Sequence, residues 1–172
     1  LSAPDPFERP IAITGGQVSI SAYSILLDEG SLIDVSGGVR VDPFGKRTYG
    51  NAGGINLIAG RDLNLPGVIG GELALNGTLR GIAGMGALGG SLSLQAQRIQ
   101  IGGAGTSTAD NLILQPGFFN EGGFASFNLT GIHSLSIAPG TVIEPVVKST
   151  VAVLYGDNRD TAVMREVLMP EG

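Results

Sequence analysis

The sequence predicts an all-β fold of the β-solenoid class, in which short strands wind into stacked coils. Three observations support this prediction. Short runs alternate apolar with polar residues, which indicates strands with one buried face. Glycine accounts for 29 of the 172 residues, well above its usual share of about 7%, which indicates frequent turns. Pairs of glycines also recur at similar intervals, as internal repeats do.

The expected strands are short, and glycine, proline, asparagine or aspartate usually closes each one. Leu, Ile, Val or Phe occupies one face of each strand, and mainly Ser, Asn and Gln occupy the other. No helix of ordinary length is expected before residue 156. The apolar pairs that define the strands are Val18/Ile20, Ile55/Leu57, Leu63/Leu65, Leu73/Leu75, Leu92/Leu94, Ile99/Ile101, Leu112/Leu114, Phe127/Leu129 and Leu135/Ile137.

The repeat is marked by the glycine pairs, which are separated by 38, 36 and 33 residues. The pairs are Gly15-Gly16, Gly53-Gly54, Gly89-Gly90 and Gly122-Gly123. A strand, a break and a second strand follow each pair, and third strands are expected at Ser31–Ser36, Glu72–Asn76 and Thr141–Val146. One coil cannot bury its own apolar face, whereas stacked coils bury a continuous aliphatic column. Leu57 and Leu94 are expected in that column.

Loops inserted between the coils are expected to project sideways from the stack. The expected insertions are Val39–Ala52, Gly81–Ala87, Gly102–Asp110 and Gln115–Asn120. The domain prediction is a lead-in over residues 1–12, β-helix coils over 13–155, and a tail or short capping helix over 156–172. The helix rests on the apolar residues at 163, 164, 167 and 168 in Thr161–Met169. An antiparallel sandwich or barrel, which also has many short strands, is the alternative architecture.

Composition excludes several functional classes. The net charge is −5 and no run of Lys or Arg exists, so a nucleic-acid partner and an anionic membrane surface are disfavoured. The chain has no cysteine, which excludes disulfides and cysteine-based zinc or catalytic sites. No stretch approaches the length of a membrane span. The start, LSAPDPFERP, does not resemble a signal peptide, so an exported protein would contain this chain as an internal piece.

Catalytic candidates are few. His133, the only histidine, is expected at a break between strands and pointing to solvent. Parallel β-helices that cleave polysaccharides need paired acids in a cleft, and the candidates for such a pair are Asp34 and Asp62. Their expected cationic partners are Arg61, Arg80 and Arg98. Most other acids fall at coil corners or near the ends of the chain, and few aromatic residues are present to stack on sugars.

Metal and cofactor motifs are incomplete. Asp157-Asn158-Arg159-Asp160 spaces two acids at i and i+3 but lacks the glutamate and glycine of a calcium loop. Gly84-Met85-Gly86-Ala87-Leu88-Gly89 matches GxGxxG, yet no helix is expected after it and no acid lies about 20 residues on. It is therefore interpreted as a flexible inserted loop. No catalytic residue, metal ligand or cofactor is predicted.

Three segments resemble a known family. DEGSLIDVSGG (28–38), INLIAGRDLNLPGVI (55–69) and GGSLSLQAQRIQIGG (89–103) are similar to repeats of filamentous haemagglutinin-like large exoproteins, the two-partner secretion adhesins of Gram-negative bacteria. Ala59–Leu65 carries the closest likeness, and the similarity covers about residues 13 to 146. The Asn-Pro-x-Gly-type motif of the family's secretion domain is absent. The chain therefore resembles a section of the shaft.

The resemblance implies a right-handed parallel β-helix that is secreted to the bacterial cell surface through an outer-membrane transporter. It implies a role in adhesion or cell–cell contact, with a host or bacterial receptor or glycan as partner, and with neighbouring coils of the parent chain stacked on its ends. Two alternatives remain at this point: an enzyme acting on polysaccharide, and a section of a trimeric fibre. A groove with clustered acids would favour the enzyme, open apolar ends the shaft, and an outer apolar stripe the fibre.

Gly60-Arg61-Asp62 is the most conspicuous charged stretch between two expected strands. It is interpreted as a coil corner, in which Gly60 allows the turn, Arg61 points to solvent and Asp62 accepts hydrogen bonds from nearby amides. The equivalent corners are expected at Ser21–Ser24 and Gln95–Arg98, where no acid occurs. The position is therefore not expected to be an active site.

Overall fold

The computed structural model describes residues 14–42, 44–65, 67–154 and 162–168 of the chain. Strands make up 49% of it, about twice the share in an average domain, which confirms the all-β prediction. In the part described, no helix has the length and hydropathy needed to cross a lipid bilayer. The lead-in predicted for residues 1–12 lies outside the described residues.

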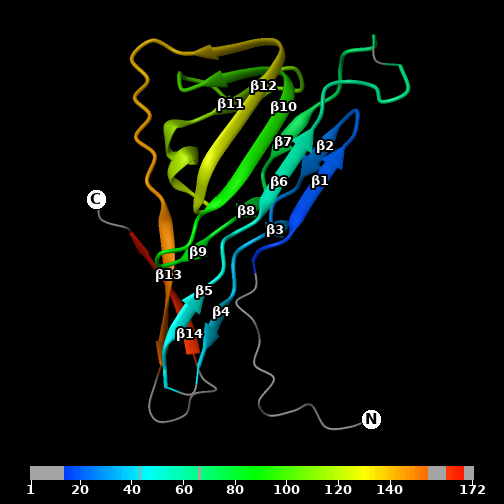
Figure 1. Cartoon of the computed structure of the whole chain (residues 1–172). Helices are drawn as coiled ribbons and strands as arrows, with labels where there is room; N and C mark the ends of the chain where they lie inside the picture. Colours follow the sequence, from blue (N-terminus) through cyan, green and yellow to red (C-terminus); the bar gives the residue numbers. More distant parts are fainter. Residues whose placement is uncertain (1–13, 43, 66, 155–161, 169–172) are drawn as a thin grey trace.

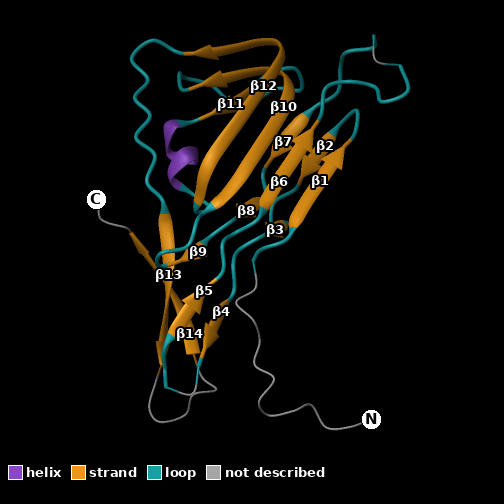
Figure 2. Ribbon diagram, viewed as in Figure 1, coloured by secondary structure: helices purple, strands orange, loops and turns teal. Residues whose placement is uncertain are grey.

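The largest sheet joins strands that are far apart in the sequence, and all of its pairings are parallel (Figures 1 and 2). Its strands are β1 (Gln17–Ser21), β6 (Gly54–Ile58), β10 (Gly90–Ile101), β11 (Leu112–Leu114) and β12 (Phe124–Ile137). The neighbouring positions Ser19 and Asn56 are 37 residues apart in the chain. Because Asn56 in turn pairs with Ser93, the same step repeats from β6 to β10.

Two smaller parallel pairs follow the same order. They are β2 (Ile25–Leu27) with β7 (Leu73–Leu75), and β3 (Leu32–Asp34) with β8 (Thr78–Arg80). The first three strands of the chain therefore each pair with the corresponding member of the set β6, β7 and β8. Three short strands thus pair in the same order in these two stretches of chain, although β8 was not among the expected strands and β7 was expected as the third strand of its unit.

The core lies behind the large sheet and consists of aliphatic side chains from the alternating positions. The most fully buried large residues are Ile55, Leu57, Leu92, Leu94 and Ile99. Leu57 is 0% and Leu94 1% exposed, which confirms that both face inward. Each such side chain contributes about 1.5–3 kcal/mol through burial. Phe119 and Phe124 close one side of the core, and their rings pack around Phe127.

The repeated glycines precede the strands of the large sheet, where segments of backbone far apart in sequence come into close contact. A Cβ atom on Gly15 would lie 1.9 Å from the Val35 carbonyl oxygen. One on Gly89 would lie 2.6 Å from the carbonyl oxygen of Gly123. These positions require glycine because no side chain fits between the stacked backbones.

Two predicted corners are replaced by continuous strands. Ile99/Ile101 belongs to β10 together with Leu92/Leu94, and the corner predicted at Gln95–Arg98 is wrong. The register with β12 shifts between Ala96 and Arg98, where both Gln97 and Arg98 face away from the core. This irregularity returns Ile99 to the core without a turn, as a β-bulge can. Leu135/Ile137 likewise belongs to β12, so His133 lies within a strand rather than at a break.

Two other strand predictions are wrong. Leu63 and Leu65 are 62% and 61% exposed and lie in a turn, because Asp62 holds this stretch in a local hydrogen-bonded loop. Thr141–Val146 has no strand. Only two of the three expected third strands therefore correspond to strands, those at Ser31–Ser36 and Glu72–Asn76.

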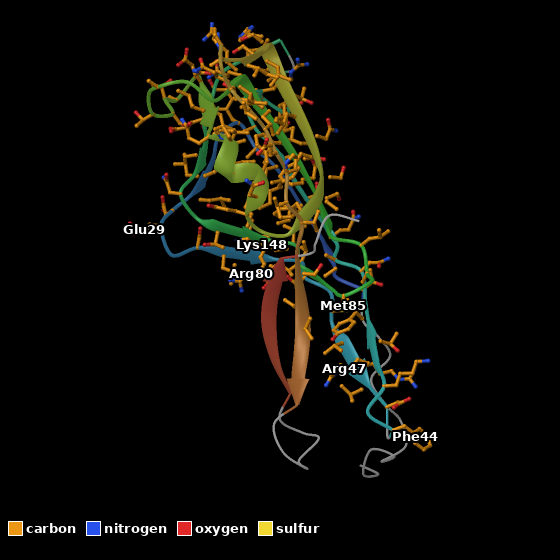
Figure 3. The ribbon with its side chains drawn as sticks, turned by 90° about the vertical axis from the view of Figure 1, so that its left-hand side faces the viewer. Glu29, Phe44, Arg47, Arg80, Met85 and Lys148 are labelled. Carbon is orange, nitrogen blue, oxygen red and sulfur yellow. The ribbon has the colours of Figure 1, made fainter. Side chains whose placement is uncertain are left out.

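The inserted segments have structure of their own. Within Val39–Ala52, β4 (Val39–Val41) and β5 (Arg47–Tyr49) form an antiparallel hairpin that projects from one end of the molecule (Figure 1). The Asp42 carboxylate closes its turn by accepting hydrogen bonds from the amides of Phe44 and Lys46. Phe44, at the tip, is 93% exposed (Figure 3). Gln115–Asn120 contains the 3₁₀ helix η1 (Pro116–Asn120), which buries Phe119.

The short helix predicted over Thr161–Met169 is wrong for the described part of that segment. Ala162–Leu168 forms β14, which pairs antiparallel with β13 (Lys148–Leu154). A short apolar run cannot be assigned to helix or strand by periodicity alone. Here β13 offers an extended partner over its full length, so the backbone hydrogen bonds of this segment are made between strands instead of within a helix.

Candidate functional site

The charged corner at Gly60–Asp62 has the structural role predicted for it. Gly60 adopts a positive φ of 88°, a conformation that glycine enters freely. The Asp62 Oδ1 atom accepts hydrogen bonds from the amides of Asn64 at 2.8 Å and Leu65 at 2.9 Å. Arg61 is exposed. The Asp62 carboxylate is thus occupied by the turn itself.

The other candidate acid, Asp34, and also Asp110, which was not a candidate, are held in surface ion pairs. Asp34 on β3 lies 3.6 Å from the guanidinium of Arg80 on β8, and both side chains are more than a third exposed. Asp110 lies 2.5 Å from the Arg98 guanidinium and is also exposed. Such surface pairs contribute about 0–1 kcal/mol each. The structure therefore gives Asp34 and Asp62 separate roles, one in an ion pair and the other in a turn.

Asp110 is the carboxylate whose acidity is altered. The Thr108 hydroxyl donates a hydrogen bond to it at 2.9 Å and lowers its pKa below the ordinary value. The nearby Arg98 guanidinium acts in the same direction through its charge. A lowered pKa keeps the group ionised, which suits an ion pair in the loop between β10 and β11 rather than a general acid.

The remaining sequence motifs do not form a site. Among the described residues, no cluster of three or more His, Asp or Glu side chains is placed to hold a metal ion, and Asp157–Asp160 lies outside them. The expected insertion Gly81–Ala87, which overlaps the GxGxxG stretch, is partly built into the fold, and only its end from Met85 onward lies in an exposed turn. Gly81 to Gly84 are buried, and β9 (Ala83–Gly84) pairs with β13. A Cβ on Gly84 would lie 1.9 Å from the Tyr49 ring, so this glycine makes room for Tyr49.

The outer face of the large sheet carries a feature that the sequence analysis did not identify. Its side chains form three rows across β1, β6, β10 and β12, and none of the positions in these rows is charged. The rows are Gln17, Gly54, Ser91 and Ser126; Ser19, Asn56, Ser93 and Asn128; and Ser21, Ile58, Gln95 and Thr130. We call this set of residues the polar face.

The polar face is hollowed into a groove of about 480 Å³ over β1, β6, β10 and β12. Gly54 is part of the lining and is buried, and the side chains of Ser91 and Gln17 lie against the position that its Cβ atom would take. Asn56 spans part of the sheet by donating a hydrogen bond from Nδ2 to the Ser19 Oγ atom at 3.2 Å. The groove is large enough for part of a small ligand, since ligand pockets are typically about 300–1,000 Å³.

A second hollow, of about 350 Å³, lies near the other side of the core. Apolar residues, including Leu79, Phe118 and Phe124, form part of its lining, and Arg80, Glu121 and Lys148 add charge. Figure 3 shows Arg80 and Lys148 in the middle part of the molecule, above the projecting hairpins. With one acid among its described lining residues, this hollow does not present the two opposed carboxylates that glycoside hydrolysis needs.

The signal for the polar face was present in the sequence. The residues between the aliphatic positions of the strands are mainly Ser, Asn and Gln, and none of those on the polar face is charged. The sequence does not show which strands are neighbours, and this pairing is needed to show that these residues form one continuous surface. Comparisons of the chain with family models, with curated proteins and with solved structures found no match.

Proposed function

We propose that the chain is a structural and binding section of a secreted bacterial surface adhesin of the filamentous haemagglutinin-like kind. In this proposal its strands are coils of a right-handed parallel β-helix, which serves as a rigid shaft in adhesion or cell–cell contact. The observation that carries the proposal is the repeated parallel register, in which Ser19, Asn56 and Ser93 lie side by side at equal steps along the chain.

The connections between strands support the winding. Parallel strands need a crossover between them, and in most proteins a helix supplies it. Here β1, β6 and β10 are connected by other short strands and loops, and among these strands β2 pairs in parallel with β7 and β3 with β8. A chain that passes through β1, β2 and β3 and then lays β6, β7 and β8 beside them in the same order has the connectivity of stacked coils.

The last strand of the sheet supports stacking of neighbouring coils on the chain. Within the described residues, β12 pairs with β10 along one edge only. Near its end, Leu135 and Ile137 are 49% and 60% exposed, and Val142 beyond it is 65% exposed. An added parallel strand would satisfy the backbone groups of this edge and cover these side chains. The outer-membrane transporter, the extracellular location and the absence of catalysis follow from the family resemblance and from the dispersed acids.

The register can be tested with paired cysteines, because the chain has none of its own. Neighbouring parallel strands lie about 4.8 Å apart, within the range that a disulfide can bridge. The double variant Ser19→Cys with Asn56→Cys should form an intramolecular disulfide on mild oxidation. The matched pair Ser19→Cys with Asn128→Cys, whose strands are separated by β6 and β10, should not. The opposite pattern would exclude the proposed stack.

The adhesive role needs a separate measurement. The chain would be displayed on a non-adherent bacterium, and attachment to host cells and aggregation of the bacteria would be counted. We expect more attachment than with the same carrier displaying the Leu57→Asp variant, whose core is disrupted. A parallel screen for depolymerisation of soluble polysaccharides, read as new reducing ends, decides between the shaft and the enzyme. Turnover that persists after further purification would reject the shaft proposal in favour of the enzyme.

A further inference from the structure

We propose that the groove on the polar face binds a neutral oligosaccharide. The inference deepens the proposed function and rests on it only for the display of this face at a cell surface. The groove itself, its residues and its lack of charge come from the structure alone.

The lack of charge is unusual for an exposed sheet. Exposed strand faces commonly carry Lys or Glu, which keep the surface solvated and prevent aggregation. The chain has 25 charged residues, but none occupies the three rows of the polar face. A charged ligand would lose hydration in this groove without gaining a counter-charge, which is costly. The groove therefore favours a ligand without formal charge.

The side chains beside Gly54 shape the floor of the groove. Gly54 contributes no side chain at the position between Gln17 and Ser91, and it is buried. A Cβ added there would lie 2.8 Å from the Ser91 Oγ atom and 3.4 Å from the Gln17 Nε2 atom. A methyl group at this position would therefore displace the Ser91 hydroxyl from its place in the lining of the groove. Ile58, half-buried in the third row, adds an apolar patch to the lining.

The hydrogen-bonding groups of the groove match hydroxyl groups. Serine hydroxyls both donate and accept hydrogen bonds, and Asn and Gln amides present one group of each kind. Asn56, Ser93 and Asn128 lie in one row, on strands that are spaced about 4.8 Å apart. A chain of neutral sugars offers hydroxyl groups that both donate and accept, together with C–H surface for contact with Ile58. A few well-placed polar groups in a partly apolar groove are what fixes the orientation of a small ligand.

Binding can be measured by nuclear magnetic resonance on the full chain labelled with ¹⁵N. The probes are neutral hexasaccharides of glucose, galactose, mannose and N-acetylglucosamine, and a hexasaccharide of galacturonic acid serves as the charged comparison. We expect at least one neutral probe to shift amide signals of β1, β6, β10 and β12, and the galacturonic acid probe to bind about tenfold more weakly or not at all.

Two variants test whether the groove is responsible. Gly54→Ala displaces the Ser91 hydroxyl, which its methyl group would approach to 2.8 Å, and Asn56→Asp places a negative charge in the second row. Each should weaken binding of the neutral probe by about tenfold or more. Asn76→Asp makes the same chemical change at an exposed position outside the groove and should leave binding unchanged. Amide spectra of all three variants would establish that each remains folded.

Three results would overturn the inference. The first is that none of the four neutral hexasaccharides shifts signals of the polar face in the folded chain. The second is that a neutral probe binds Gly54→Ala and Asn56→Asp as well as the parent. The third is that the galacturonic acid probe binds more tightly than the neutral ones. If any of these occurs while the double variant Ser19→Cys with Asn56→Cys still forms its disulfide, the proposed shaft stands and only the glycan inference fails.

Discussion

Gly53 lies against Gly16 so closely that a Cβ atom on Gly53 would be 1.7 Å from the Gly16 carbonyl oxygen. The relationship is not symmetrical, since a Cβ on Gly16 would meet nothing within 4 Å. We therefore expect Gly53→Ala to lower the free energy of unfolding by about 1–3 kcal/mol, because backbone must move to admit the methyl group. Gly16→Ala should change it by about 0.5 kcal/mol or less. Urea unfolding of both variants measures the difference, and equal effects would contradict the close backbone contact.

The inward orientation of Leu57 can be tested by comparing substitutions of two leucines. Leu57 is fully buried, whereas Leu63, which the sequence pattern placed in a strand of the same kind, is 62% exposed. We expect Leu57→Asp to unfold the chain, because an unpaired charge cannot be accommodated in the core. Leu63→Asp should keep the melting temperature of the parent to within a few degrees. Circular dichroism during heating measures both, and retention of the parent melting temperature by Leu57→Asp would refute the inward assignment.

The turn held by Asp62 predicts that substitutions of this residue lower the free energy of unfolding by different amounts. Removing both acceptor contacts in Asp62→Ala should lower the free energy of unfolding by about 1 kcal/mol, the usual contribution of such hydrogen bonds. Asp62→Asn keeps a side-chain oxygen in the same place and should retain most of the stability. Arg61→Ala, at the exposed neighbour, should have little effect. Denaturant titration compares the three, and a larger loss for Arg61→Ala than for Asp62→Ala would show that the turn is not held by the aspartate.

Asp110 predicts a local dependence on pH. The Thr108 hydroxyl, and then the Arg98 guanidinium, keep its pKa below 3.8. Because the folded pKa is lowered, its contribution to stability is present above the unfolded pKa and is lost as the pH falls through the folded value. The side chain is exposed, so the effect should appear in the loop rather than in global unfolding. Titration followed by carboxyl ¹³C shifts should show the pKa of Asp110 rising toward 3.8 in Thr108→Ala. An unchanged pKa would contradict the role of the hydroxyl.

Strand positions were predictable wherever local alternation coincided with a glycine pair. Ile55/Leu57 and Leu92/Leu94 followed such pairs and form the centre of the sheet. Leu63/Leu65 alternates equally well, but the Asp62 carboxylate accepts hydrogen bonds from the amides of Asn64 and Leu65 and holds the backbone in a loop. Alternation indicates which residues could face a core. The local hydrogen bonds of Asp62 determine that Leu63 and Leu65 do not form a strand that packs against it.

The alternation of apolar and polar residues could not show that β10 and β12 are continuous strands. A polar pair at Gln97-Arg98 breaks the alternation in β10 as a corner would, and a bulge and a corner have the same sequence signature here. The assignment of Ala162–Leu168 depends on β13, a partner that periodicity does not reveal. The polar face required the register between β1, β6, β10 and β12, because its neighbouring residues, such as Ser19 and Asn56, lie as far as 37 residues apart in sequence.

The distance along the chain between paired positions differs among the sheets. Positions on β1 and β6 are separated by 37 residues, whereas the contact between Ser24 and Glu72, beside β2 and β7, spans 48. The turn closed by Asp62 absorbs the extra chain without altering the register of either sheet. The fold can therefore lengthen at a corner while its strands stay aligned. That property makes the stretch from Arg61 to Gly71 a place where new sequence can be grafted without changing how the strands pair.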